Sequence, residues 1–337
     1  MRRMRAPLLL LLLIFDIAKS TISISSGTSG GYSYVEGDSV DKGHMRRAIE
    51  LASTAVGRTN PNPCVGCVLV DSNNEVVGEG FHHRAGEPHA EVMAIRDCIL
   101  NNKSTENTTA YVSLEPCSHY GRTPPCTLTL INNGIRRVVS GMVDPDSRVS
   151  GSGLQYLRDN DVDVVVGVLH DECEKLNRGF VHRIVFKKPY IIQVKRSSIK
   201  RDSLAVVINK AIAENNDVDT VVLSDEILLD PNLAIMDKIP SHVAIVTKIS
   251  VESNVEKIKS SIDKSKMDRK IIYICSKGMS KTLSISDTAN ATIFVDSIDT
   301  LTAATLQQIA SFGSNVVLFV EDESIEAQNL CYIDDVM

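Results

Sequence analysis

Three residues of this sequence carry side chains that commonly bind zinc, and a carboxylate stands close to one of them. His89 and Glu91 occur in the segment EPHAE, and Cys117 and Cys126 occur in the segment EPCSHYGRTPPC. One imidazole and two thiolates can hold zinc and leave its fourth position open, which is the ligand count of a catalytic site. Zinc lowers the pKa of bound water to about 7, and Glu91 can move the proton of that water without binding the metal. The four residues together predict zinc-dependent hydrolysis.

The elements that must position these residues alternate between helices and strands. The predicted helices cover residues 39–56, 88–99, 125–133, 153–160 and 171–182, and the predicted strands cover 65–70, 76–81, 110–114, 136–143 and 162–169. His89 and Glu91 fall in the first turn of a helix, and Cys117 follows a strand directly. This order predicts an α/β unit with a central sheet covered by helices.

After Lys187–Pro189 the pattern starts again, with weaker signals. Strands are predicted at 190–195, 219–223, 243–247, 271–275, 292–295 and 315–320, and helices at 203–213, 252–264 and 298–311. The total of 337 residues is enough for roughly two domains of this kind. We therefore expect a second α/β unit after the joint.

Composition and charge exclude several classes of protein. The chain is 43% apolar and 23% charged, which is ordinary for a globular protein, and a net charge of −6 argues against a general nucleic-acid binder. The eight cysteines are scattered over the whole length, so their density is low for a disulfide-stapled scaffold. Most of them are therefore expected to be reduced thiols.

The first 38 residues differ from the rest. The segment MRRMRAPLLLLLLIF has a basic start followed by an apolar run far shorter than the roughly 20 residues that a membrane span needs. A basic region followed by a short apolar run is typical of a signal peptide, and a Ser- and Gly-rich stretch follows it. Residues 1–38 are therefore predicted to be a targeting leader outside the fold, with no membrane association in the mature protein.

The motif resembles the zinc deaminases, whose signature is His-x-Glu followed by Pro-Cys-x-x-Cys. Here eight residues separate the two cysteines, a spacing that resembles the deaminase of riboflavin biosynthesis. Further matching segments are NPCVGCVLV, GEGFHHRAGEPHAE, TAYVSLEPCSHYGRTPPC and the run that ends in LNRGFVHR. The resemblance covers roughly residues 41–186 and implies a three-layer αβα cytidine-deaminase-like domain, expected over 39–186.

The resemblance also implies a role for individual residues. His89, Cys117 and Cys126 resemble the zinc ligands, and Glu91 resembles the proton shuttle. Four further positions resemble substrate contacts: Asn62 for the pyrimidine, His82 and His119 for the substrate generally, and Arg122 for the ribosyl phosphate. A guanidinium suits phosphate because its donors form a planar fork.

The implied reaction is hydrolytic deamination of 2,5-diamino-6-(5-phosphoribosylamino)pyrimidin-4(3H)-one to 5-amino-6-(5-phosphoribosylamino)uracil and ammonia. The implied cofactor is Zn²⁺, and the implied partner is this small phosphoribosylated pyrimidine rather than a nucleic acid. A homo-oligomer is expected. Because plant members of the family are plastidial, the leader is expected to direct the protein to a plastid, with secretion and a cytosolic form left open.

In many members of this family an NADPH-dependent reductase domain follows, and residues 187–337 resemble a truncated, dihydrofolate-reductase-like version of it. Where the family has an Ala-Ser-Leu-Asp-Gly-like segment, this chain has SSIKR, and Asp322 and Glu323 replace two glycines in VLFVEDES. Glycines allow close approach of the backbone to a dinucleotide phosphate, whereas acidic side chains add bulk and repulsive charge. The second unit is therefore predicted to be a degenerate, non-reducing remnant.

Several alternatives remain open from the sequence. The chain could be a bifunctional deaminase–reductase, a pseudoenzyme that binds a partner reductase, or a zinc deaminase for a free base or RNA. Cys117 and Cys126 could instead pair as a disulfide. Cys64 and Cys67 have the spacing of a metal or redox pair, but they stand at the start of an apolar strand and are expected to pack in the core.

Overall fold

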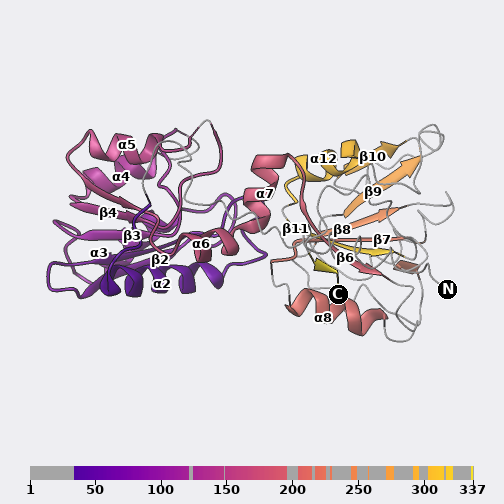
Figure 1. The fold of residues 1–337 in the computed structure, drawn as a ribbon, viewed down its shortest axis with the longest axis horizontal. Coiled ribbons are helices and arrows are strands. Elements are labelled where there is room, and N and C mark those ends of the chain that lie inside the picture. Colours follow the sequence, from indigo (N-terminus) through magenta and orange to yellow (C-terminus); the bar gives the residue numbers. More distant parts are fainter. Residues whose placement is uncertain are drawn as a thin grey trace, which may run out of the picture.

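In the computed structural model the strands form two separate sheets, one from the first part of the chain and one from the second (Figure 1). It describes residues 34–120, 124–147, 149–195, 204–214, 217–224, 228–229, 244–248, 257, 271–276, 291–295, 303–314, 316–321 and 335–336. Several predictions lie outside the described residues: those for the leader up to residue 33, for Arg122, for the segment SSIKR and for Asp322 and Glu323, as does the helix predicted over 252–264 apart from Lys257.

The first group of elements follows the predicted order closely. Its helices and strands are α2 (Ser39–Ser53), β1 (Gly66–Val70), β2 (Val76–Phe81), α3 (Ala90–Leu100), β3 (Thr109–Val112), α4 (Cys126–Asn132), β4 (Arg137–Ser140), α5 (Ser152–Arg158), β5 (Asp163–Val166), α6 (His170–Leu176) and α7 (Arg178–Phe186). The strands form one five-stranded sheet in the order β2-β1-β3-β4-β5. Strand β1 is antiparallel to both its neighbours, and β3, β4 and β5 run parallel.

Helices cover both faces of this sheet, so the predicted three layers are confirmed. Side chains alternate along a strand, and in β1 Cys67 and Leu69 point to one face while Val68 and Val70 point to the other. The first face packs against α3, α4 and α5, and the second packs against α2 and α6. Two apolar cores therefore hold the sheet between its helices.

Helix α3, which carries the predicted catalytic glutamate, lies unusually close to strand β2. A Cβ atom placed on Gly80 would stand 2.3 Å from the Ala94 backbone nitrogen, and one on Gly78 would stand 2.3 Å from the Ala94 carbonyl oxygen. No other residue type fits at these two positions without moving the helix. The glycines of the GEGF segment therefore set the distance between α3 and the sheet.

Helix α2 is held to the opposite face by a buried charged group. The carboxylate of Asp41, which is 6% exposed, accepts a hydrogen bond from the Tyr111 hydroxyl at 2.8 Å and two from the Arg137 guanidinium at 2.9 and 2.8 Å. Burial alone would raise the pKa of Asp41, but these bonds outweigh it and lower that pKa. The paired charges link α2 to β3 and β4.

The helix predicted over residues 171–182 is two helices, so that prediction was wrong in its continuity. Helices α6 and α7 meet at Asn177, which is 3% exposed. The Asn177 side chain accepts a hydrogen bond from Cys64 N at 2.8 Å and donates one to Cys64 O at 2.9 Å. This pairing with a loop 113 residues earlier stabilises the break between α6 and α7. Because the contact is long-range, the local hydrophobic periodicity does not predict the break.

The second group of elements forms a separate seven-stranded sheet. It contains β6 (Tyr190–Lys195), α8 (Leu204–Glu214), β7 (Thr220–Ser224), β8 (Ala244–Lys248), β9 (Ile271–Ser276), β10 (Ala291–Val295), α12 (Ala303–Ser311), β11 (Val316–Glu321) and β12 (Asp335–Val336). The strand order is β10-β9-β8-β7-β11-β6-β12, and every pair is parallel. Helices α8 and α12 lie on opposite sides of the sheet in Figure 1, which confirms a second α/β unit.

The segment before α2 also contacts the first sheet. Val35 N donates a hydrogen bond to Val166 O at 2.8 Å, and the Tyr34 ring packs edge-on against His170 with 4.6 Å between ring centroids. Residues 34–38, which the sequence placed in the leader, therefore lie against β5 and α6. Within the described ranges, no helix combines the length and apolar character that crossing a bilayer requires.

Candidate metal centre and active site

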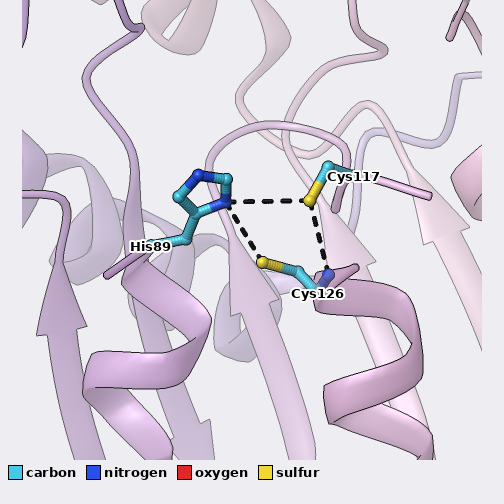
Figure 2. Close-up of side chains that lie close together, drawn as sticks. All are labelled: His89, Cys117 and Cys126. Carbon is cyan, nitrogen blue, oxygen red and sulfur yellow. Dashed lines mark hydrogen bonds between the residues drawn. The ribbon is translucent and has the colours of Figure 1, made fainter. Parts of the chain in front are cut away.

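Three elements bring the predicted ligands together at one point (Figure 2). His89 directly precedes α3, Cys126 is the first residue of α4, and Cys117 lies in the loop that follows β3. His89 Nδ1 stands 3.3 Å from Cys126 Sγ and 3.7 Å from Cys117 Sγ. All three donor atoms lie within 4.8 Å of one another, although 28 and 37 residues separate His89 from the two cysteines.

The donor set fits a tetrahedral zinc ion. Zinc binds imidazole nitrogen at about 2.0–2.1 Å and thiolate sulfur at about 2.3 Å, which places nitrogen and sulfur ligands roughly 3.5 Å apart across a tetrahedral angle. The two observed nitrogen–sulfur distances bracket that value. Because Nδ1 is the atom that faces both sulfurs, His89 would bind through Nδ1.

The electrostatic surroundings favour the ionised form of a cysteine. Cys126 N, at the start of α4, donates a hydrogen bond to Cys117 Sγ at 3.3 Å, and the positive end of the helix dipole points the same way. The contact with the Cys126 thiol lowers the pKa of Cys117, and the same contact raises the pKa of Cys126. Both cysteines are free thiols, so the alternative of a disulfide between them is not what the structure contains.

Glu91 lies beside the three ligands without being one of them. It belongs to the first turn of α3, is 3% exposed, and lines the same cavity as His89 and Cys117. Burial raises the pKa of Glu91, negative charge on Cys117 raises it further, and His89 lowers it. A raised pKa brings a carboxyl group closer to the pH at which it can both take up and release a proton, as a general acid–base group must.

His82 and Asn62 form a hydrogen-bonded pair at the cavity wall. His82 Nδ1 lies 3.1 Å from Pro88 O, and His82 Nε2 lies 3.0 Å from Asn62 Nδ2. A carbonyl oxygen can only accept, so Nδ1 carries the proton and Nε2 accepts from the Asn62 amide. Burial, the largest effect, lowers the pKa of His82, which favours this neutral ring. Both ring nitrogens are engaged, so in this structure His82 orients Asn62.

The cavity around these residues has a volume of about 650 Å³. Asn62, His82, His89, Glu91, Cys117 and His119 all line it, so one space collects six of the predicted site residues. His119 lies at its exposed rim. Cys126 is buried, 1% exposed, and is not one of the lining residues. Arg122 is outside the described residues.

The cavity also contains residues that sequence analysis did not select. Glu115, Asp144, Asp146, Phe180 and Arg183 line it. Two signals could have found some of them: Glu115 belongs to the quoted EPCSH segment, and Asp144 follows β4 at the carboxyl edge of the parallel strands, where ligands commonly bind in α/β sheets. Phe180 and Arg183 belong to the quoted segment LNRGFVHR, but nothing local in that segment indicates that their side chains reach this cavity.

Glu115 fastens the loop between β4 and α5 to the metal-site loop. Its carboxylate, which is 4% exposed, accepts hydrogen bonds from Asp144 N at 3.0 Å, Gly151 N at 2.9 Å and Gly153 N at 2.9 Å. A Cβ on Gly153 would stand 2.2 Å from Pro116 O, so the two loops are in close contact there. Three charge-assisted bonds to one carboxylate hold this part of the cavity wall in place.

Replacing Glu115 with glutamine is expected to loosen this wall. One terminal group of glutamine cannot accept, so at least one of the three buried backbone N–H groups loses its partner, at a cost of about 1–3 kcal/mol in unfolding free energy. Urea denaturation measures this loss, and the metal content of the folded variant checks that the ligands stay in place. An unchanged denaturation midpoint would contradict the role given to Glu115.

Cys64 and Cys67 do not form a second metal site. Cys67 is fully buried in the core between β1 and α3, and Cys64 Sγ lies 3.3 Å from the Thr59 hydroxyl. Burial raises the pKa of both thiols, to about 11 for Cys64. The prediction that they pack in the core is confirmed.

Comparison with known proteins agrees with this architecture. The family model for the cytidine and deoxycytidylate deaminase zinc-binding region matches residues 38–142. A solved structure from Thermotoga maritima, described as a diaminohydroxyphosphoribosylaminopyrimidine deaminase/5-amino-6-(5-phosphoribosylamino)uracil reductase, superimposes with a TM-score of 0.67 at 27% identity. That superposition covers 84% of this chain and 81% of the other. Fold and site therefore define a zinc-binding domain of the cytidine-deaminase type.

Two curated relatives are more similar in sequence. The chain is 54% identical over 151 residues to the chloroplastic riboflavin biosynthesis protein PYRD of Arabidopsis thaliana, of which it covers 34%. It is 46% identical over 141 residues to the diaminohydroxyphosphoribosylamino-pyrimidine deaminase of Buchnera aphidicola, of which it covers 93%. This chain belongs to the diaminohydroxyphosphoribosylaminopyrimidine deaminase family. The match spans only about a third of the plant relatives' length, 34% and 38%.

Proposed function

We propose that the chain hydrolyses the exocyclic amine of 2,5-diamino-6-(5-phosphoribosylamino)pyrimidin-4(3H)-one, which yields 5-amino-6-(5-phosphoribosylamino)uracil and ammonia. The observation that carries the proposal is the convergence of His89, Cys117 and Cys126 on one point with Glu91 in the same cavity. The names of the Buchnera and Thermotoga relatives support the choice of substrate.

Each residue has a separate task in this proposal. His89 Nδ1 and the two thiolates would hold Zn²⁺, which when bound supplies the Lewis acidity that makes water acidic enough to react at neutral pH. Glu91 accepts one proton from water and delivers it to the ring nitrogen, and it then takes the second proton from the added hydroxyl and delivers it to the departing amine. Asn62, oriented by His82, hydrogen-bonds the pyrimidine edge, and His119 contacts the substrate at the rim. Water oxygen thus replaces the amine on the ring carbon; one proton of water stays on the ring nitrogen and the other leaves in ammonia.

We propose that residues 39–186 form the deaminase domain and that residues 187–337 form a reductase-like domain that does not reduce substrate. Two departures support this assignment: SSIKR lacks the Asp and Gly of the family segment, and the acidic side chains of Asp322 and Glu323 would repel a dinucleotide phosphate. A bifunctional deaminase–reductase remains the alternative, favoured by the likeness to the Thermotoga enzyme across 84% of the chain.

One assay with the purified chain tests both parts. We expect about one zinc per chain, release of ammonia from the phosphoribosylated pyrimidine, and no oxidation of NADPH when it is added. Absence of ammonia release by zinc-loaded protein would reject the deaminase proposal. Oxidation of NADPH in proportion to the pyrimidinedione formed would reject a non-reducing second domain and show a bifunctional deaminase–reductase.

The location and assembly state are proposed from the N-terminal sequence, the names of the plant relatives and the family resemblance. The basic, apolar N-terminal segment and the chloroplastic names of the plant relatives support targeting to a plastid. We also propose a homo-oligomer, as expected from the family resemblance. Fluorescent tagging at residue 337 and light scattering of the purified protein test these two proposals.

A further inference from the structure

Helix α7, which joins the two sheets, is fastened to the loop that carries Asn62. The buried side chain of Asn177 hydrogen-bonds both the amide and the carbonyl of Cys64 just before α7 begins. At the other end of the loop, Arg183 Nη2 donates a hydrogen bond to Pro61 O at 2.7 Å. The helix and the loop are therefore held together on both sides of Asn62.

Two residues of α7 contribute directly to the cavity wall. Phe180 and Arg183 are three residues apart, so they lie on the same face of the helix, and both line the cavity. The Arg183 guanidinium lies over the Phe180 ring, 5.7 Å from its centroid. The ring contact and the bond to Pro61 O keep the guanidinium at the wall.

The charges of the cavity are unevenly distributed. Among the described lining residues Arg183 is the only arginine or lysine, whereas Glu91, Glu115, Asp144 and Asp146 are acidic. Burial lowers the pKa of Arg183 and nearby Asp219 raises it, but a guanidinium stays protonated at neutral pH. Partial burial also weakens the screening of its charge by water. An anionic group in this cavity is therefore repelled by the acidic side chains and attracted to α7.

The cavity is larger than a pyrimidine ring requires. Its volume of about 650 Å³ lies within the roughly 300–1,000 Å³ range of sites that enclose whole small molecules. A substrate whose amine reaches the metal ligands consequently has room for a polar tail inside the same space. The distribution of charges favours binding of a negatively charged tail beside Arg183.

We propose that Arg183 is a specificity-determining residue that binds the phosphate of the substrate tail through its guanidinium, an inference that rests on the proposed deaminase function. The planar fork of a guanidinium matches two phosphate oxygens, and such charge-assisted bonds are about twice as strong as neutral ones. The joint helix thus completes the deaminase cavity and selects a phosphorylated pyrimidine over its dephosphorylated form.

The test compares Arg183→Met with the unchanged chain on two substrates, the phosphorylated aminopyrimidine and the same compound without phosphate. Methionine keeps an apolar stem over Phe180 but removes the charge. We expect kcat/KM for the phosphorylated compound to fall about ten- to a hundredfold, because charge-assisted bonds of this strength are lost. For the dephosphorylated compound we expect a change of less than about threefold, so the preference for phosphate collapses. Arg183→Lys should restore part of that preference.

Three outcomes separate the possible failures. An equal loss on both substrates would reduce Arg183 to a packing role through Pro61 O, and an unchanged ratio would leave phosphate binding to other residues such as Arg122; either overturns the inference. No ammonia release by the unchanged chain would instead remove the proposed function itself. The matched control is Arg136→Met, which removes an exposed arginine outside the cavity lining and should leave both values unchanged.

Discussion

Replacing Glu91 with glutamine is expected to lower the rate of ammonia release by about 10²- to 10⁴-fold while zinc remains bound, because general acid–base groups contribute on this scale. Glutamine has nearly the same shape as glutamate, and it occupies the same 3% exposed position at the start of α3. It cannot take up a proton and pass it on. The proposed reaction needs that transfer twice, once to the ring nitrogen and once to the departing amine.

The measurement is steady-state ammonia release together with zinc content of the same preparation. Glu87→Gln is a matched control, since Glu87 lies four residues earlier and pairs with Arg84 on the surface rather than with the cavity. That variant should keep full activity. If Glu91→Gln retained more than about a tenth of the activity, the loss would be much smaller than removal of a proton shuttle causes. Glu91 would then not be the proton shuttle. Zinc loss in the same variant would instead make Glu91 part of the metal site.

Replacing Cys126 with alanine is expected to remove both the metal and the activity. Two protein ligands remain in that variant, and tetrahedral zinc sites of the catalytic kind use three protein ligands. Because Cys126 is 1% exposed and its backbone amide also supports Cys117 Sγ, the side chain is lost at the centre of the site while the helix start is kept. Zinc after dialysis should fall well below half an ion per chain, and ammonia release should fall in parallel.

Cys98→Ala provides the control for loss of a buried thiol. Cys98 is fully buried in α3 and packs in the apolar core between α3 and the sheet, but it is not among the three converging donors. It should lose some stability and keep its zinc. Stoichiometric zinc and full turnover in Cys126→Ala would show that this thiol is not a ligand. A melting curve on each variant distinguishes loss of metal from loss of fold.

The identity of the chemical groups was readable from the sequence because it depends on short segments. His89 and Glu91 are two residues apart at a helix start. The run EPCSHYGRTPPC contains both cysteines and is specific enough to identify them without information from other segments. Strand positions were equally local: β6 begins and ends at the residues that apolar patterning predicted, and most other strands differ by a residue or so. These features follow from periodicity and side-chain type within a window of about ten residues.

The tertiary structure decided which distant residues share a space with those groups. Asn177 interrupts a helix because it pairs with Cys64, Glu115 holds backbone amides up to 38 residues away, and Arg183 reaches the cavity from the joint between the sheets. Each of these roles depends on a contact between segments that the sheet topology brings together, and no local pattern encodes such a contact. The chemistry of a side chain follows from its residue type, whereas the wall of a cavity forms only when distant segments of the chain pack together.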